Sequence, residues 1–208
     1  MDLSGIKNIF FDLGNVILNI DPAKTAEAFE KHGVADFNKL YNLHNQVILF
    51  SLFETGKITE VEFCQSIRKE ADIFISDMDV KSSWNAMLLN FPNERIELLK
   101  KLKENYNLYL ISNTNYIHYK SYNSKFKKEY GYNLKELFNR AFLSHEMGMR
   151  KPDLRTFQRI LSMTKLVPEE TLFIDDLAEN IEAGNQVGMR SVLLEEGKDL
   201  VDLFQEIK

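Results

Sequence analysis

The chain of 208 residues carries a net charge of −5, and its 44% hydrophobic and 27% charged residues are ordinary for a globular protein. The acidic balance argues against nucleic acid as a partner, because phosphate binding needs a positive field. One cysteine, Cys64, excludes an internal disulfide, and the sequence shows neither a signal-peptide pattern nor an apolar run of roughly 18 residues. We therefore expect a cytoplasmic protein without a membrane partner.

Five short apolar runs are expected to form buried strands, because their residues do not alternate between apolar and polar. The runs are residues 9–11, 108–111, 141–143, 171–174 and 191–194. Helices are expected between the later runs, at 92–104, 153–165 and 178–188. Strands that alternate with helices predict an α/β fold, with a Rossmann-like parallel sheet and helices on both faces.

Residues 19–90 interrupt this alternation with a stretch that has no strand signal. Helices are expected at 21–33, 36–54, 59–71 and 79–91, with aromatic residues such as Phe37, Tyr41 and Phe63 in the core of the bundle. We interpret 19–90 as an inserted all-helical cap, and 1–18 together with 91–208 as the α/β core. The Lys- and Tyr-rich segment 119–132 is interpreted as a solvated face of a helix or loop rather than a nucleic-acid site.

Polar residues follow the apolar runs at the points where the strands are expected to end. Asp12 follows the first run, Ser112–Thr114 the second, and Asp175 and Asp176 the fourth, while the third leads to Lys151. In a parallel sheet these ends meet at one edge, where ligands bind. Carboxylates with a hydroxyl group and a lysine suit a phosphate group with Mg²⁺, which prefers hard oxygen ligands.

Each of these signals has an ordinary structural explanation when taken alone. A single Asp after a strand is commonly a turn residue or a helix cap, and a Ser-Asn-Thr triplet is a common turn. The acidic pair at 175–176 can cap the helix expected from Ala178. Their occurrence at successive strand ends, in this order, favours the functional interpretation.

Four segments of the chain resemble the motifs of the haloacid dehalogenase-like hydrolase superfamily. They are FFDLGNV at 10–16, LISNT at 110–114, GMRKPD at 148–153 and FIDDLAEN at 173–180. The insertion resembles the helical cap of one subfamily, and the finer pattern resembles a bacterial subgroup associated with sugar phosphates, including glucose 1-phosphate phosphatases. The resemblance implies a Mg²⁺-dependent phosphomonoester hydrolase for a small phosphorylated metabolite, active as a monomer or homodimer.

The resemblance also implies roles for individual residues. Asp12 is the expected nucleophile, which forms an aspartyl phosphate that water then hydrolyses. Ser112 and Asn113 are expected to bind substrate, and Lys151 to balance the negative charge. The expected metal ligands are Asp12, the carbonyl of Gly14 and Asp176, with Asp175 direct or through water, and Asn180 supports them.

Gly14 departs from the family pattern, because typical phosphatases of the family carry a general acid and base Asp at this position. Three accounts remain open: a substrate with a better leaving group, such as a sugar 1-phosphate; a replacement residue from the cap or a nearby loop; or a catalytically weak protein that binds phosphorylated metabolites. Asp21, His32 and His44 are the candidate replacements. Asn15 stands where the family usually has Gly, and Asn tolerates positive φ.

Other assignments fit the sequence less well. Dehalogenases of the family place a Tyr where Gly14 stands, and they do not need a metal. The acidic pair 175–176, in contrast, indicates a metal site. A phospho-accepting receiver domain has its acidic pair after the first strand, and a dinucleotide site needs more glycines than FDLGNV offers. Glu54 and Lys57 either face the site or form a turn between cap helices, and we assign no role to His118 or His145.

Overall fold

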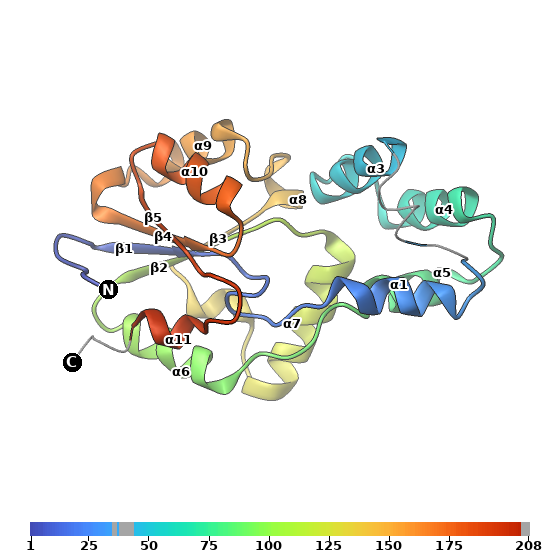
Figure 1. Ribbon diagram of the computed structural model, residues 1–208, viewed down its shortest axis with the longest axis horizontal. Helices are drawn as coiled ribbons and strands as arrows, with labels where there is room; N and C mark the ends of the chain where they lie inside the picture. Colours follow the sequence, from blue (N-terminus) through green and yellow to red (C-terminus); the bar gives the residue numbers. More distant parts are fainter. Residues whose placement is uncertain (35–36, 38–43, 205–208) are drawn as a thin grey trace.

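The computed structural model describes residues 1–34, 37 and 44–204, and it is built on one parallel sheet (Figure 1). The strands are β1 (Asn8–Phe11), β2 (Asn107–Ser112), β3 (Arg140–Leu143), β4 (Thr171–Asp175) and β5 (Arg190–Leu193). Their order is β3-β2-β1-β4-β5, and every neighbouring pair is parallel. The expected α/β fold class is confirmed, and each expected run agrees with its strand to within one residue at either end.

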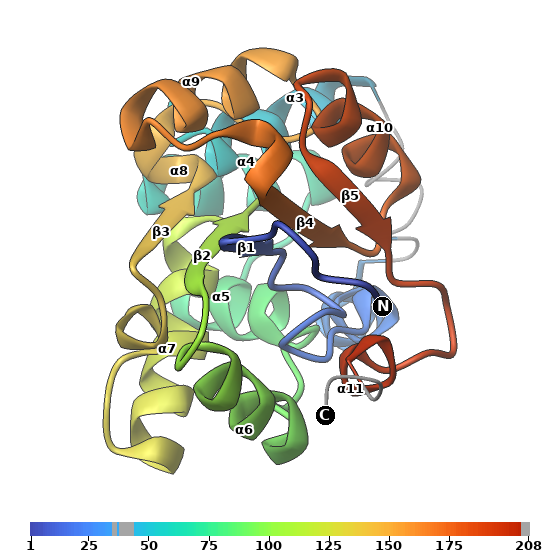
Figure 2. The ribbon, with the colours of Figure 1, turned by 90° about the vertical axis from the view of Figure 1, so that its left-hand side faces the viewer.

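Helices cover both faces of the sheet, as the view in Figure 2 shows. One face carries α9 (Leu154–Thr164) and α10 (Ala178–Gln186), and the other carries α6 (Asn93–Leu102), α7 (Tyr116–Tyr130) and α11 (Leu200–Leu203). Neighbouring residues of β1 serve different faces: Phe10 packs in the cluster with Phe157 of α9, and Phe11 in the cluster with Leu99 of α6. Short helical turns lie at α8 (Ser144–Met147), η1 (Leu134–Leu137) and η2 (Pro168–Glu170).

Four further helices lie beside the sheet in Figure 1, and we call them the cap helices. They are α1 (Pro22–Glu30), α3 (His44–Glu54), α4 (Glu60–Ala71) and α5 (Asp77–Asn85). They share an aromatic core of their own, in which Phe37, Phe63 and Trp84 are buried. Tyr41, which we expected in this core, lies outside the described residues. The domain limits at 18/19 and 90/91 stay a prediction.

Local signals explain where several helices begin and end. Asp21 caps α1, with Pro22 as its first residue, and Thr59 with Glu62 forms the capping box of α4. The helix expected at 79–91 is wrong at both ends, because a capping box at Ser76 starts α5 earlier and the helix stops at Asn85. The segment expected to be solvated at 119–132 lies largely in α7, where it also buries apolar side chains.

The residues after α5 are not helical because their backbone pairs with residues 19–21, the segment that leads from the core into the cap helices. Asn19 donates its N–H to Asn90 and accepts from Leu89, and the Asp21 N–H bonds the Met87 carbonyl. An isolated antiparallel bridge joins Ile20 to Leu88 within the same ribbon. Both crossings between the sheet and the cap helices are therefore fixed to each other in a two-stranded hinge.

Candidate active site

The register of the sheet places two acidic residues side by side at its carboxyl edge. Phe11 pairs with Ile174 across β1 and β4, and the Asp12 N–H bonds the Ile174 carbonyl at 2.9 Å. The next residue on each strand is acidic, so Asp12 lies level with Asp175. One oxygen from each of Asp12, Asp175 and Asp176 lies within 4.8 Å of the others. The strand-end carboxylates that the sequence predicted therefore meet in space.

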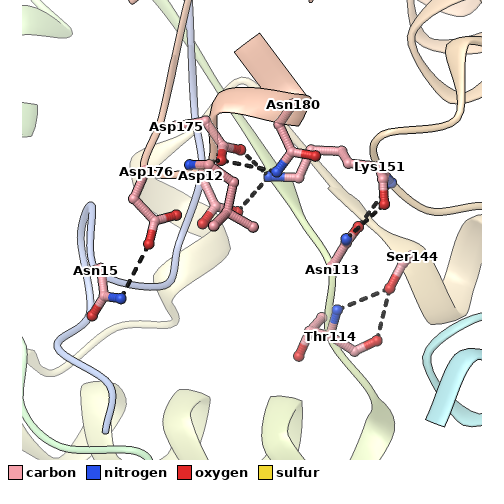
Figure 3. A network of polar contacts seen from close by, with 10 residues as sticks. Asp12, Asn15, Asn113, Thr114, Ser144, Lys151, Asp175, Asp176 and Asn180 are labelled. Carbon is pink, nitrogen blue, oxygen red and sulfur yellow. Dashed lines mark hydrogen bonds and ion pairs between the residues drawn. The ribbon is translucent and has the colours of Figure 1, made fainter. Parts of the chain in front are cut away.

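A buried lysine joins the two strands at this edge (Figure 3). Lys151 Nζ donates to Asp12 Oδ1 at 2.6 Å and to Asp175 Oδ2 at 2.5 Å, and the lysine is only 1% exposed. Burial lowers the pKa of Lys151, but the two carboxylates outweigh it and raise the pKa above its usual value. Lys151 is therefore held charged at the centre of the cluster.

The two acidic residues after β4 differ in how much of each carboxylate is free. Asp175 is fully buried, and it accepts from Lys151 through Oδ2 and from the Leu177 N–H and Asn180 Nδ2, both at 2.9 Å, through Oδ1. Asp176 is half-buried and accepts one side-chain hydrogen bond, from Asn15 Nδ2 at 3.1 Å. Asp176 is therefore the better placed of the two to offer an oxygen to a metal ion.

The loops that carry these residues are tied to β2 by side-chain bonds to backbone. The Asn113 amide accepts from the Lys151 N–H and donates to the Lys151 carbonyl, both at 2.9 Å. Ser144 Oγ accepts from the Thr114 N–H and donates to the Thr114 carbonyl, both at 2.8 Å. Asn113 thus positions Lys151, and it lines the pocket together with the buried Ser112, so both residues have the location expected of substrate-binding residues. Their role in substrate binding stays a prediction.

At Gly14, where the sequence departs from the family pattern, a neighbouring side chain lies close to the backbone. Gly14 does not need positive φ, whereas Asn15 adopts φ 55° as expected for an Asn in place of Gly. A Cβ built at Gly14 would lie 3.0 Å from Ile20 Cδ1 and 3.8 Å from Asp12 Oδ2. A side chain here would face the Asp12 carboxylate, but Ile20 of the hinge occupies part of its space.

The charge balance of the cluster fits a divalent cation. Lys151 offsets one of three carboxylate charges, which leaves an excess of negative charge. Burial raises the pKa of Asp12 to about 7, with Asp175 and Asp176 adding to the effect of burial and Lys151 opposing it. Three carboxylates whose oxygens lie within 4.8 Å of one another, with too little positive charge to balance them, are a ligand set of the kind that Mg²⁺ prefers.

The cluster lies at the base of a pocket of about 350 Å³ between the sheet and the cap helices. Asp12, Ser112 and Lys151 line it from the core, and Trp84 and Glu54 line it from the cap. Arg150, next to Lys151, reaches across and places NH1 3.2 Å from Glu54 Oε2. The cap helices therefore form part of the wall around the strand-end cluster.

Of the other candidate residues named from the sequence, the structure shows which line the pocket. Asp21 caps α1, and His32 is exposed; neither lines this pocket. The side chain of His44 lies outside the described part of the chain. Lys57 is also absent from the pocket wall, so of the pair in the ETGKIT segment only Glu54 reaches it.

His118, to which the sequence gave us no role, lies in the wall of the pocket and joins it to the cap. Its ring stacks on Trp84 at 5.1 Å between centroids, and Nε2 lies 3.0 Å from the Trp84 carbonyl. The three-residue spacing from Asn115, which caps α7, could have indicated a buried helix start. No sequence signal links His118 to Trp84.

The chain matches the family model described as haloacid dehalogenase-like hydrolase over residues 6–188. It belongs to this family. D-ribitol-5-phosphate phosphatase of Bacteroides thetaiotaomicron is 30% identical over 93% of this chain and 94% of its own length. Glyceraldehyde 3-phosphate phosphatase of Pyrococcus furiosus is 27% identical over 93% of this chain and 82% of its own length.

A solved structure of a haloacid dehalogenase family enzyme from Bacteroides thetaiotaomicron, in complex with magnesium and inorganic phosphate, resembles this protein closely. Its TM-score is 0.85 at 32% identity, with 96% of this chain and 100% of that chain covered. The family assignment confirms that the protein is a hydrolase of the haloacid dehalogenase-like class. Within the described residues, no helix has the length and apolar character needed to span a membrane.

Proposed function

We propose that the protein is a Mg²⁺-dependent phosphomonoesterase that acts on a small polyol or sugar phosphate through an aspartyl phosphate on Asp12. The observation that carries the proposal is the bonding of Lys151 to both Asp12 and Asp175 beside a third carboxylate. This arrangement presents an oriented carboxylate nucleophile in a site prepared for a cation and a dianion. The similarity to a magnesium and phosphate complex supports the same assignment.

The reaction has two displacement steps at phosphorus, in which the residues of the site have different roles. An Asp12 oxygen forms a bond to phosphorus as the bond to the leaving oxygen breaks, and water then attacks phosphorus and releases Asp12. Lys151 holds Asp12 in one orientation and keeps positive charge beside it, and the Ser112 hydroxyl donates to a phosphate oxygen. Asp12, the Gly14 carbonyl and Asp176 would hold Mg²⁺, with Asp175 through water, and the bound ion would neutralise charge on the transferring group.

Unpaired polar atoms in the pocket wall support a hydroxyl-rich leaving group. Trp84 Nε1 and Arg150 Nε are both buried, and neither has a hydrogen-bond partner. A buried donor without a partner is costly, and hydroxyl groups of a bound substrate would satisfy it. The pocket volume suits a small metabolite, and two relatives are named for phosphates of small hydroxylated compounds.

The test is phosphate release from a panel of phosphomonoesters, including ribitol 5-phosphate, glyceraldehyde 3-phosphate and hexose 1-phosphates, with and without Mg²⁺. We expect Mg²⁺-dependent turnover that disappears in Asp12→Asn. Turnover without Mg²⁺, or in Asp12→Asn, would contradict the proposal, and absence of turnover on every compound would favour the weakly catalytic binding protein. Cytoplasmic location and a monomeric or homodimeric state stay predictions.

A further inference from the structure

The proposed phosphatase reaction, on which this inference rests, lacks a proton donor at the position where a side chain would be expected. A poor leaving group such as an alkoxide must be protonated as it departs, and the attacking water must then lose a proton. Gly14 supplies neither function. Another group in the pocket wall would therefore have to perform both functions.

Most titratable groups in the described wall of the pocket are committed elsewhere. Asp12 and Asp176 belong to the carboxylate cluster, and Lys151 is bonded to two carboxylates. Both ring nitrogens of His118 have partners, the Trp84 carbonyl and Asn115 Nδ2. Asp12 and Asp176 are already assigned as nucleophile and metal ligand, Lys151 is held by the two carboxylates, and the His118 ring has no free nitrogen.

Two further groups in the wall are unsuited to both steps. Burial raises the pKa of Tyr122 well above its usual range, and the Arg150 guanidinium carries hydrogen-bond donors but no acceptor. Glu54 remains. Its Oε2 is buried and makes no hydrogen bond, although Arg150 NH1 lies 3.2 Å away.

We propose that Glu54 of the cap donates the proton to the leaving oxygen in the first step and accepts the proton of the attacking water in the second. The Glu54 O–H bond breaks as the bond from phosphorus to the leaving oxygen breaks, and the product leaves as a neutral alcohol. The resulting carboxylate takes a proton from water while the water oxygen bonds to phosphorus and the bond between phosphorus and the Asp12 oxygen of the acyl phosphate breaks. Glu54 ends protonated again, and inorganic phosphate is released.

The surroundings of Glu54 suit this exchange. Burial raises the pKa of the Glu54 carboxyl above its usual value, and Arg150 opposes the effect without cancelling it. A carboxyl group with a pKa nearer neutrality both donates and accepts protons efficiently. Within the described residues, Arg150 is the charged group that faces Glu54, so it also stabilises the carboxylate formed between the two steps.

The cap turn that follows Glu54 is held against the core by close packing. A Cβ built at Gly56 would lie 2.3 Å from the His145 carbonyl oxygen, and Gly56 has φ 65°. The turn therefore approaches α8 more closely than any side chain would allow. This contact and the Arg150 ion pair together hold Glu54 in the wall of the pocket that Asp12 and Asp176 also line.

The experiment compares substrates whose leaving groups differ in their need for a proton. Glu54→Gln keeps the shape of the side chain and removes the acid, and Glu70→Gln makes the same change at an exposed cap glutamate. Single-turnover formation and decay of the phosphoenzyme are measured by acid quench with ribitol 5-phosphate and with p-nitrophenyl phosphate. The expected loss in Glu54→Gln is about 10²-fold or more for formation from the alkyl phosphate but less than about 10-fold from the aryl phosphate.

Decay of the phosphoenzyme is expected to slow in Glu54→Gln whichever substrate formed it, because the second step is the same. Glu70→Gln should match the wild-type protein in every rate. An equal loss of the formation rate with both substrates, or a wild-type rate with the alkyl phosphate, overturns the role of Glu54. Absence of turnover by the wild-type protein on both substrates overturns this inference and the proposed function together. If turnover is lost in Asp12→Asn but unchanged in Glu54→Gln, the inference alone is overturned.

A rescue variant separates proton transfer from structural damage. Ile20→Val deletes the Cδ1 atom that lies 3.0 Å from a Cβ at Gly14, so Gly14→Asp then gains the space it needs. We expect Glu54→Gln combined with Gly14→Asp and Ile20→Val to recover at least about 10-fold of the lost alkyl phosphate rate. Glu54→Gln with Ile20→Val alone should recover none, and recovery in that control would contradict proton transfer by Glu54.

Discussion

Protonation of His118 should unfold the junction between the cap helices and the core at mildly acidic pH. The Trp84 carbonyl can only accept, so Nε2 carries the proton of the neutral ring. Nδ1 faces Asn115 Nδ2, because Asn115 Oδ1 already accepts the His118 backbone N–H. A second proton on Nδ1 would therefore meet a donor in a buried position.

The size of the effect follows from the pKa of His118. Burial lowers it from 6.5 to about 4, and the bond to Trp84 only partly opposes this. The folded state thus binds the proton less readily than the unfolded state. The free energy of unfolding therefore keeps its full value with respect to His118 above pH 6.5 and falls as the pH drops toward 4. The full loss is about 3 kcal/mol, at about 1.36 kcal/mol for each pH unit between the two values.

The assay is urea unfolding of the wild-type protein and His118→Asn at pH values from 7.5 to about 4. Other groups also titrate in this range, so the quantity compared is the difference in slope of the unfolding free energy against pH. The wild-type slope should exceed the variant slope by about 1 kcal/mol per pH unit near pH 5.3, where the two states differ by almost one bound proton. His32→Asn changes an exposed histidine of the cap and serves as the matched control.

Parallel curves for the wild-type protein and His118→Asn would refute the reasoning, because the slope would then arise elsewhere. An equal change of slope in His32→Asn would refute it too. A decrease in stability of His118→Asn at every pH is compatible with it, since the variant also loses the ring stacked on Trp84. Only the pH dependence of the unfolding free energy shows whether His118 takes up a proton.

Three other outcomes follow from the site. Gly56→Ala should destabilise the protein by at least about 1 kcal/mol in thermal melts and raise KM, because the new Cβ meets the His145 carbonyl at 2.3 Å; an unchanged KM would show that the turn moves freely. Asn113→Ala should cost about 2 kcal/mol in urea unfolding and lower kcat, because the Lys151 loop loses two bonds; a stable variant with normal kcat would contradict this. Mg²⁺ at about a hundred times its Kd should stabilise the wild-type protein by about 2.7 kcal/mol but not Asp176→Ala, as followed by thermal melts.

The sequence predicted the parts of the site that depend on local pattern. Apolar runs identified the strands, and the parallel sheet then required Asp12, Asp175 and the loop of Lys151 to meet at one edge. It could not predict which side chains from the cap would reach this edge. Glu54 and Arg150 are distant in the chain, and their contact depends on how the cap helices sit on the core.

The end of α5 illustrates the same limit in the fold. Residues 86–91 keep a helical spacing of apolar residues, but backbone pairing with residues 19–21 competes with the helix and wins. The steric role of Ile20 has the same origin, because Ile20 is positioned over Gly14 by this hinge and by its bridge to Leu88. Tertiary pairing, which no single segment encodes, decides both features.

A proton donor carried by the cap can work only while the cap is seated, whereas one at position 14 would belong to the core. The seating contact at Gly56 should therefore matter less once the acid is moved. In the wild-type background, Gly56→Ala should slow phosphoenzyme formation from ribitol 5-phosphate more than from p-nitrophenyl phosphate, because it displaces Glu54. With Glu54→Gln, Gly14→Asp and Ile20→Val present, the same change should affect both substrates equally, and a persistent difference between them would mean that the cap turn acts on the leaving group by another route.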